Sequence, residues 1–495
     1  MIDSSLSFRR GYFLGKIEVP INEWWRVLKL KHGLYLHSHE DLKVEEIICK
    51  GGSFFVLGEI FSTVSSDINL DELANCESRE MVFECLKSWA GRFVVLCEFS
   101  GEYELFTDPV SLKNAYYSVR SDSQISVASD LSLFREFKFK KREDCKNFLK
   151  FINKELPKVG HGDCWIGNET IYADVFKLLP NKYLKLNDFS EGRSWPNSSF
   201  STKGNTKDIA IQIADKIKTV LFSASNTNRL AIAVTAGYDS RVVAAASKSL
   251  VNEPYYFIDR LKNSSINEID IDVASEVTAR LEKKLVVHDL PEENIPSEFE
   301  KLYYQNTHFA TTRRLFTVND YTVKLKNKLN VCGVGEVGRS RFGHYMPFMD
   351  SDFLAYKYGY INSPYAKKMS KEWFSESFPI CKRYGIDPLT LFYWEQDLGN
   401  WGSVGNAESD IAIEEINPFN SYSIFELMLQ VRKEDCRNDK NILFDEIIKY
   451  LEPSLAEVPI NPVFGIKNRV KSILKKEPLF TFLDFVKFKY KTVFK

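Results

Sequence analysis

The segment AIAVTAGYDSR (231–241) decides how the chain folds. Its first four residues are apolar, which predicts a buried strand, and Thr-Ala-Gly then predicts a turn. Asp239 and Ser240 follow where an expected helix, SRVVAAASKSL (240–250), begins. A strand that ends in a glycine turn and leads straight into a helix is typical of a parallel α/β sheet. Backbone N–H groups at such a turn can bind anions.

The same alternation continues along the chain on both sides of this segment. The expected helices are 208–221, 268–284 and 293–306, and the expected strands are 229–234, 254–258, 285–290 and part of 326–335. Strands that alternate with helices imply right-handed crossovers, a parallel sheet and ligands at the carboxyl ends of the strands. Beyond about residue 350 the sequence predicts mostly helix.

The first part of the chain has a different pattern, in which short β-branched and aromatic runs are separated by Gly, Asp and Ser. The expected strands are 51–61, 91–99, 103–108, 114–119 and 124–129, followed by a helix at 142–155 and two strands within 167–186 around a Pro-Asn turn. The polar stretch 191–206 has little periodicity and is the expected linker. We therefore predict a first domain over 1–190 and a second over 207–495.

Composition narrows the classes of protein that this chain can belong to. Of its 495 residues, 44% are apolar and 27% are charged, and the net charge is −1, so nothing favours nucleic-acid binding. The nine cysteines are scattered without a CxxC pair, which fits reduced thiols. No signal peptide or long apolar run is evident, so a soluble cytoplasmic protein is expected. His37 and His39 lack a third ligand nearby and are expected to be surface residues rather than a metal pair.

The residues of the 234–241 turn point to phosphate and metal chemistry. Thr235, Gly237 and Ser240 would offer hydroxyl and backbone donors to an anion at the start of a helix. Asp239 would repel a bare phosphate, so its presence makes sense if Mg²⁺ lies between the two. The alternative is purely structural, because Asp-Ser can cap a helix and glycine can make the turn.

The turn resembles the SGGxDS loop of the N-type ATP pyrophosphatases, above all the synthetase domain of asparagine synthetases, β-lactam synthetase and the lasso-peptide cyclases. GNETIYADVFKLLPNKYL (167–184) is similar to the segment that ends the glutaminase-like domain in that family. CGVGEVGRS (332–340) resembles the family's second loop, and EEINPFNS (414–421) loosely matches its ExRxPFLD segment. Similar loops, and a pattern like PSLAEVPINP (453–462), occur in relatives from surface-polysaccharide gene clusters. The resemblance extends over nearly the whole chain.

The resemblance implies a fold and an activity. The fold would be α/β, with an N-terminal nucleophile (Ntn) hydrolase-like αββα domain followed by an adenine nucleotide α-hydrolase-like synthetase domain with a helical C-terminal part. The activity would be an ATP-dependent ligase that adenylates a carboxylate, releases pyrophosphate and transfers the acyl group to ammonia or an amine. The reaction could be the amidation of a sugar acid in the biosynthesis of a surface polysaccharide. A peptide macrolactam cyclase and a non-catalytic scaffold are the alternatives.

The resemblance also assigns roles to residues at the matching positions. The nucleotide-binding residues would be Thr235, Ala236, Gly237, Tyr238, Asp239, Ser240, Gly333, Gly335 and Arg339, the metal ligands Asp239 and Glu336, and the catalytic residues Glu414, Lys467 and Arg241. ATP and Mg²⁺ are the implied ligands.

Three departures from the family pattern shape these expectations. Ile2 stands where the glutaminase needs its nucleophilic cysteine, so the first domain should not hydrolyse glutamine. Ala236 adds a methyl group to the phosphate loop. Val337 occupies the position of the metal-binding aspartate, so Glu336 is expected to bind the metal while Val337 turns into the core.

Two basic features allow a structural and a functional interpretation. Arg241, Arg339 and Arg341 lie beside the two loops and could hold triphosphate or a substrate carboxylate, or could form surface ion pairs. The segment 466–495 carries nine Lys or Arg and two acids among apolar residues. It could be a C-terminal helix packed on the domain, or a peripheral contact with a membrane or a protein partner.

Overall fold

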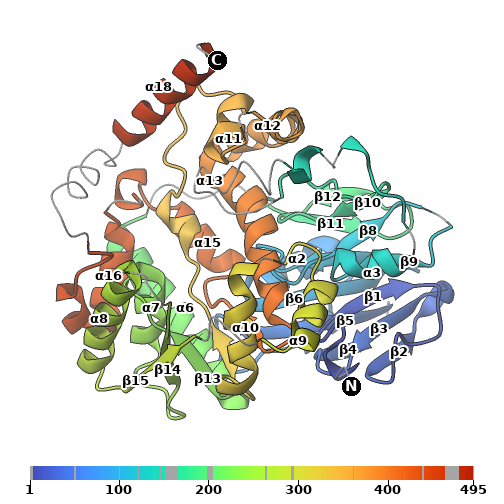
Figure 1. Ribbon diagram of the computed structural model, residues 1–495, viewed down its shortest axis with the longest axis horizontal. Helices are drawn as coiled ribbons and strands as arrows, with labels where there is room; N and C mark the ends of the chain where they lie inside the picture. The colour runs from blue at the N-terminus through green and yellow to red at the C-terminus, as the bar shows by residue number, and fades with distance from the viewer. Residues whose placement is uncertain are drawn as a thin grey trace.

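The structure is a computed structural model of the chain (Figure 1). It describes residues 4–49, 52–99, 101–120, 122–137, 139–144, 147–150, 165–197, 204–261, 265–290, 295–310, 312–360, 362–437, 440–462 and 479–493. Within these residues the molecule is a mixed α/β protein with two antiparallel sheets and one parallel sheet. The coarse fold class predicted from the sequence is therefore confirmed. Half of the expected helix at 142–155 falls outside the described residues, and the described residues 147–150 are helical.

The N-terminal part is a sandwich of two six-stranded antiparallel sheets, on the right of Figure 1. The first sheet has the order β10-β8-β9-β1-β3-β2, with β1 (Tyr12–Gly15), β2 (Trp25–Lys29), β3 (Tyr35–His39), β8 (Tyr116–Ser118), β9 (Ile125–Ala128) and β10 (Val175–Lys177). The second has the order β12-β11-β7-β6-β5-β4, with β4 (Val44–Cys49), β5 (Gly52–Ser62), β6 (Trp89–Phe99), β7 (Glu102–Thr107), β11 (Lys182–Lys185) and β12 (Glu191–Arg193). The sequence predicted β5 to β11 but missed the first four strands.

Successive side chains of a strand point to opposite faces of its sheet, so each sheet of this sandwich can pack on both of its faces. Leu14 and Leu36 of the first sheet pack against Leu57 and Leu105 of the second in a closed inner core. On the outer face of the second sheet, α1 (Asp71–Ala74) and α2 (Arg79–Lys87) cover a separate apolar cluster. The helix α3 (Leu131–Glu136) packs outside the first sheet. The layers are thus helix, sheet, sheet, helix.

The second part contains a five-stranded, fully parallel sheet. Its order is β15-β14-β13-β16-β17, with β13 (Leu230–Ala233), β14 (Tyr255–Arg260), β15 (Leu285–Asp289), β16 (Leu329–Val331) and β17 (Glu414–Ile416). The helices α6 (Thr206–Thr227), α7 (Tyr238–Ala246) and α8 (Ser265–Arg280) cover one face, and α9 (Ser297–Asn306) and α10 (Thr312–Lys324) the other. The sequence predicted this alternation, apart from α10 and the three-residue β17.

The strand order places a topological switch point between β13 and β16. From β13 the chain winds through β14 to β15, then crosses to the other side of β13 to form β16 and β17. Right-handed crossovers in opposite directions put their helices on opposite faces, so α7 and α8 lie on one face and α10 on the other. At such a point the loops that leave the two neighbouring strands diverge and leave room for a ligand at the carboxyl edge.

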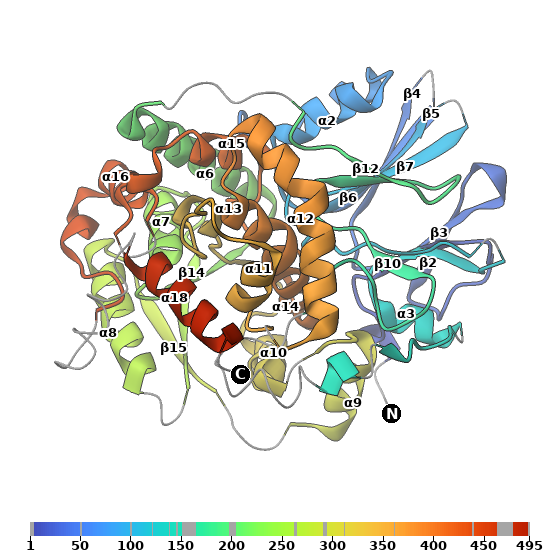
Figure 2. The ribbon, with the colours of Figure 1, turned by 90° about the horizontal axis from the view of Figure 1, so that it is seen from above.

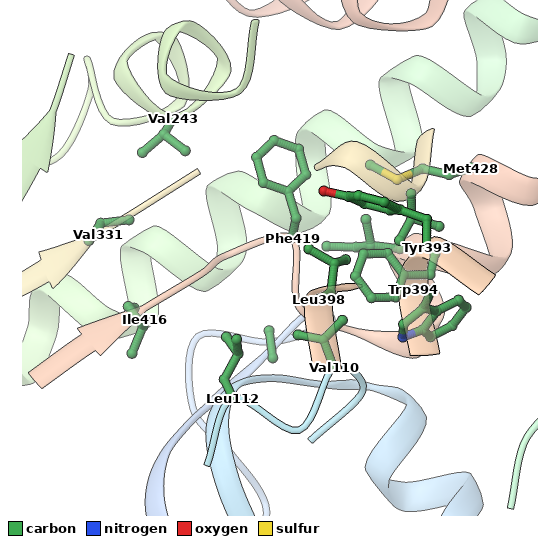
Figure 3. Close-up of a cluster of buried hydrophobic side chains, with 14 of the residues drawn as sticks. Val110, Leu112, Val243, Val331, Tyr393, Trp394, Leu398, Ile416, Phe419 and Met428 are labelled. Carbon is green, nitrogen blue, oxygen red and sulfur yellow. The ribbon is translucent and has the colours of Figure 1, made fainter. Parts of the chain in front are cut away.

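Helices from the last third of the chain lie between the sandwich and the parallel sheet (Figure 2): α13 (Pro388–Phe392), the π-helix η4 (Tyr393–Gly402), α14 (Ser403–Ser409) and α15 (Tyr422–Leu429). The helices α11 (Ser351–Lys357) and α12 (Pro364–Tyr384) pack on one another, and α18 (Leu479–Val493) packs on α11 at the periphery (Figure 1). The helix α16 (Ile442–Leu451) packs on α6 and α7. One continuous core results: Figure 3 shows Val110 and Leu112 of the sandwich, Trp394 and Leu398 of η4, and Ile416 of the parallel sheet within a single cluster.

The boundary between the two parts differs from the prediction. Glu191–Arg193 form β12 and pair with β11, so the sandwich continues into the segment 191–206 that was expected to be a linker. Trp195 is fully buried against Trp394 of η4. Residues 191–195 therefore belong to the folded interface between the two parts. No helix of the described residues is long and apolar enough to cross a membrane.

Candidate functional site

The loops that leave β13 and β16 meet at the side chain of Asp239, at the topological switch point. Asp239 lies in the first turn of α7, directly after the loop 234–237. Its Oδ1 accepts a hydrogen bond of 3.1 Å from the Gly335 backbone N–H of the second loop. Its Oδ2 lies 2.5 Å from Nη1 of Arg339, in the short 3₁₀ helix η3 (Glu336–Arg339). One carboxylate thus joins the two loops.

The second loop needs glycine because it passes so close to Asp239. A Cβ atom at Gly333 would lie 2.8 Å from the carbonyl oxygen of Asp239. A Cβ atom at Gly335 would lie 2.9 Å from Oδ1 of Asp239 and 2.7 Å from the ring of Phe444. These separations are below van der Waals contact, so larger residues would push the loops apart. The glycines that the sequence assigned to ligand binding therefore also allow the two loops to pack closely.

The first loop presents hydroxyls and an open helix terminus. The Oγ of Ser240 lies 2.8 Å from Oγ1 of Thr235 and accepts a 3.1 Å hydrogen bond from the Thr235 backbone N–H. Gly237 is the N-cap of α7 and makes no side-chain capping bond. The amides of a first helical turn have no partner within the helix, and the helix dipole adds partial positive charge there. Thr235 is exposed, so this end of α7 is accessible to an anion.

Glu336 lies beside this junction and supplies a second carboxyl, which is partly buried. The hydroxyl of Tyr393, the first residue of η4, donates to its Oε2, and Nε of Arg341 lies 3.8 Å from its Oε1. Burial raises the pKa of Glu336, Arg341 and Arg339 lower it, and the negative charge of Asp239 raises it. Its neighbour Val337 is buried, which confirms the prediction that this residue turns into the core.

Electrostatics place Asp239 and Glu336 in one site. Burial is also the main cause of the raised pKa of Asp239, and Arg339 opposes it. Desolvation therefore destabilises the ionised form of each carboxylate, and the two negative charges repel one another. A positive charge between them, from a guanidinium or from a metal ion, would relieve both effects.

Arg241 does not face this site, although the sequence placed it among the catalytic residues. Its guanidinium is fully buried and donates to the backbone carbonyls of Val458 and Pro459, at 2.5 Å and 2.8 Å. Burial lowers its pKa to about 10. Arg241 instead ties the segment after η6 (Pro453–Glu457) to the first loop. The backbone N–H of Asn461 donates to the carbonyl of Ala236 at 3.0 Å, which adds to this attachment.

Glu414 lies at the opposite edge of the sheet from the two loops, which corrects its expected catalytic role. It is the first residue of β17 and pairs with Leu329, the first residue of β16, at the amino edge. Its Oε1 lies 3.0 Å from Nη1 of the buried Arg92, and its Oε2 lies 3.6 Å from Nε of Arg10. Glu414 therefore joins the parallel sheet to the sandwich. The loose sequence match indicated neither the strand β17 nor the position of the Glu414 side chain relative to the site.

Of the remaining predicted residues, some support the first loop and the others lie outside the described residues. Tyr238 is buried with its ring against Phe444 of α16, so it supports the loop from behind. Ala236 is buried as well, and its carbonyl accepts the bond from Asn461. Lys467 and Ile2 lie outside the described residues.

Sequence reasoning missed several residues that shape the site. The Ala236 backbone N–H donates to Oδ1 of Asp270 of α8 across 3.4 Å. Asn417 bonds both backbone groups of Val334, at 3.2 Å and 3.0 Å, and fixes the second loop. No sequence pattern points to Tyr393 as a site residue, because its position opposite Glu336 depends on the π-helix. Asn417 follows the strand β17, so its place at the carboxyl edge could have been inferred had that strand been recognised.

The two histidines of the HSH segment are structural, but the sequence placed them wrongly. His37 and His39 are fully buried rather than at the surface. Nε2 of His37 lies 2.7 Å from the carbonyl of Ile17, and Nε2 of His39 lies 2.9 Å from that of Ser5. Burial lowers the pKa of His37 to about 4, which favours the neutral ring stacked on Phe13.

The donor set of the site suits Mg²⁺ that arrives with a phosphate ligand. No cluster of three or more His, Cys, Asp or Glu side chains in the described part of the chain could hold a metal alone. Mg²⁺, however, is commonly held by one or two carboxylates together with substrate phosphates and water. Asp239 and Glu336 supply two carboxylates, and their oxygens keep lone pairs beyond the bonds they make.

Comparison with known proteins adds no family to this geometry: no protein-family model matches the chain, and no curated protein matches it. What the fold and the site define is an α/β protein with a candidate anion site at a topological switch point.

Proposed function

We propose that the chain is an ATP-dependent carbon–nitrogen ligase that forms AMP and pyrophosphate. The observation that carries the proposal is the position of Asp239, which joins the loops after β13 and β16 at the carboxyl edge of the sheet. In open α/β sheets ligands bind at this place, and a helix N-terminus there favours phosphate. A carboxylate at a phosphate site is explained by a bridging metal ion.

The finer fold assignment belongs to the same proposal. The helix–sheet–sheet–helix layers of the sandwich fit an Ntn hydrolase-like domain, and the sheet order β15-β14-β13-β16-β17 fits an adenine nucleotide α-hydrolase-like domain. Together with the resemblance of the segments 167–184, 234–241 and 332–340, these features support the asparagine synthetase-like family. The resemblance also favours the subgroup from surface-polysaccharide gene clusters.

In this proposal the first loop binds the phosphates that leave as pyrophosphate. Thr235, Ser240 and the first amides of α7 would donate hydrogen bonds, and Gly237 would let the phosphates approach the backbone. Asp239 and Glu336 would hold Mg²⁺, which when bound neutralises charge on the leaving group. Arg339 and Arg341 lie beside these carboxylates and can add positive charge.

The chemistry would proceed in two steps at this edge of the sheet. A carboxylate oxygen of the substrate attacks the α-phosphorus, and the bond to pyrophosphate breaks. Ammonia or an amine then attacks the acyl carbon, and AMP leaves. The protein contributes position and preorganised charge to both steps. Glu414 and Arg241 have no part in them, because one lies at the amino edge and the other is bound to backbone carbonyls.

The carboxylate and the amine remain open within this proposal. Amidation of a sugar acid is one candidate, and a peptide macrolactam cyclase would use the same adenylation with an amine from its own substrate. A scaffold without activity would bind nucleotide weakly or not at all. Since Ile2 replaces the nucleophilic cysteine, free ammonia or a substrate amine would be the nitrogen source.

The products distinguish these classes of activity. The full chain should be incubated with Mg²⁺, α-labelled ATP and a small-molecule extract of the cells that produce it, with hydroxylamine to trap activated carboxylates. We expect labelled AMP and a hydroxamate, and neither product from Asp239→Asn. Labelled ADP would contradict the proposal, and so would AMP formation that is unaffected by Asp239→Asn. Glutamate release from glutamine would contradict the inactive glutaminase.

A further inference from the structure

The sandwich holds the π-helix η4 by hydrogen bonds near the start and near the end of the helix. Close to the start, Nε1 of Trp394 donates to the carbonyl of Pro109, in the loop after β7, at 2.7 Å. Close to the end, Nζ of the buried Lys177 of β10 donates to the carbonyl of Gly399 at 2.6 Å. Most π-helical segments are single turns, whereas η4 has ten residues. Contacts from outside the helix therefore have to stabilise its geometry.

A third attachment of η4 is the buried carboxylate of Glu395, a residue that is 2% exposed. Its Oε1 accepts hydrogen bonds from Nδ2 of Asn181 at 2.9 Å and from Nη1 of Arg193 at 2.6 Å, both in the sandwich. Its Oε2 accepts from Nε1 of Trp373 at 2.7 Å and from Oγ of Ser377 at 3.4 Å, both in α12. A fully satisfied buried network of this kind is rigid. Glu395 thus fixes η4 relative to the sandwich and to α12.

Tyr393, two residues before Glu395, is the point at which η4 reaches the candidate site. Its hydroxyl donates to Oε2 of Glu336, and its ring meets that of Phe342, with centroids 5.0 Å apart. Figure 3 shows this tyrosine beside Trp394 of the same helix. Because the hydroxyl is carried by η4, a shift or rotation of the helix would move it away from Glu336.

We propose that the sandwich positions Tyr393, and through it Glu336, by holding η4, and that Asn181 is a positioning residue for the candidate site. Asn181 contacts Glu395 in η4, and Tyr393 of the same helix contacts Glu336. The role of Glu336 as a metal ligand rests on the proposed function, whereas the contacts that hold Tyr393 do not. This positioning gives the sandwich a role that needs no nucleophilic cysteine.

Asn181 allows a substitution that removes little besides one hydrogen bond. Its φ is +68°, in the left-handed region that glycine adopts without strain. Asn181→Gly therefore keeps the backbone and removes the amide that donates to Glu395. Asn327→Gly is the matched control, because Asn327 also has a left-handed φ, of +59°, and is exposed between α10 and β16. Glu395→Gln is a second variant, which keeps the shape of the side chain and disturbs all of its hydrogen bonds.

Fluorine NMR of the full chain, with fluorotyrosine in place of Tyr393, reports the surroundings of this ring without any nucleotide. Glu336→Gln should move the resonance, because the two side chains are in contact. Asn181→Gly and Glu395→Gln should also move or broaden it, since the ring loses its fixed place, and Asn327→Gly should leave it unchanged. In calorimetric titrations Asn181→Gly should weaken MgATP binding by about threefold, a loss of the size expected for one hydrogen bond.

An Asn181→Gly spectrum identical to that of the unmodified chain would overturn the proposal, and so would MgATP affinity that stays the same while the resonance moves. An equal response to Asn327→Gly would overturn it too, because the effect would then come from the glycine and not from the lost hydrogen bond. If the unmodified chain binds no MgATP but its resonance responds to Asn181→Gly alone, the proposed function fails and the positioning of Tyr393 stands. Thermal unfolding checks that each variant is folded, and Asn181→Gly decides the test if Glu395→Gln does not fold.

Discussion

Arg339 and Asp239 form a buried ion pair in which Nη1 and Oδ2 lie 2.5 Å apart, and this pair joins the two loops of the candidate site. Asp239 lies in α7, which follows β13, and Arg339 lies in η3, which follows β16. The two residues meet because β13 and β16 are neighbours in the sheet. The pair gives Asp239 two roles: it holds the loops together, and it presents a carboxylate at the carboxyl edge.

The two roles of Asp239 can be separated by a double-mutant cycle. Asp239→Asn and Arg339→Gln should each lower the free energy of unfolding by about 3–5 kcal/mol, because each leaves a buried charge without its partner. The double variant should recover part of this loss, since neither charge remains. Urea unfolding measures the three values. Strictly additive effects would show that the pair does not stabilise the junction.

The glycines of the two loops should respond differently to a methyl group. Gly335→Ala should destabilise the fold strongly, because its Cβ would lie 2.7 Å from Phe444 and 2.9 Å from Asp239. Gly237→Ala has more space, with its nearest neighbour 3.5 Å away, and should cost at most about 1 kcal/mol as an N-cap change. It should nevertheless weaken nucleotide binding. Thermal unfolding and nucleotide titration test the pair, and equal stability of the two variants would contradict this packing.

Much of the fold could be predicted from the sequence, because local patterns of apolar residues indicate most of its strands and helices. The run AIAV before a glycine turn predicted β13, and the helical periodicity around it predicted α6 to α8. The short strand β17 was missed because its three residues, EEI, carry too little pattern and are held by pairing with β16. The residues 191–193 look like a linker and become a strand only because β11 offers an edge.

The site was predictable only where its residues are contiguous in the sequence. The loops at 234–240 and 332–340 were found because glycine, hydroxyl and carboxylate residues follow a strand. Arg241 was misassigned, since nothing in the sequence shows that its guanidinium meets the carbonyls of Val458 and Pro459. Tyr393 was missed for the same reason: its contact with Glu336 joins residues far apart in the chain.

Glu414 should matter for stability and not for nucleotide binding. Glu414→Gln removes the charge that faces Arg92 across 3.0 Å and should cost about 1–3 kcal/mol of unfolding free energy. Affinity for MgATP should stay unchanged, because the side chain lies at the amino edge of the sheet. Thermal unfolding and titration with nucleotide measure the two effects. A loss of MgATP affinity in a folded Glu414→Gln variant would contradict this location.

The pH dependence of MgATP binding should reflect the carboxyls of Asp239 and Glu336. Burial raises the pKa of Asp239 and of Glu336 above their ordinary values of 3.8 and 4.5. A protonated carboxyl cannot bind the metal, so affinity should be lost as pH falls, beginning above the range in which exposed acids titrate. Binding titrations at a series of pH values test this expectation.

Tyr393→Phe should move that loss of affinity to higher pH. The tyrosine hydroxyl donates to Glu336 and so favours its ionised form, and removing it raises the pKa of Glu336 further. The matched control is Tyr450→Phe, whose hydroxyl lies 3.1 Å from Asp215 at the surface. The control should leave the profile in place, whereas an unchanged profile for Tyr393→Phe would show that this contact does not set the protonation of Glu336.

Calorimetric titration with ATP measures whether Asp239 and Glu336 together hold the magnesium of a bound nucleotide. The unmodified chain should bind ATP in the presence of Mg²⁺ and lose most of its affinity with a chelator. Asp239→Asn and Glu336→Gln should each weaken binding by at least about tenfold, which corresponds to about 1.4 kcal/mol. Glu414→Gln is the matched control and should bind normally. Binding that does not need Mg²⁺, or that survives both carboxylate substitutions, would contradict a magnesium site formed by Asp239 and Glu336.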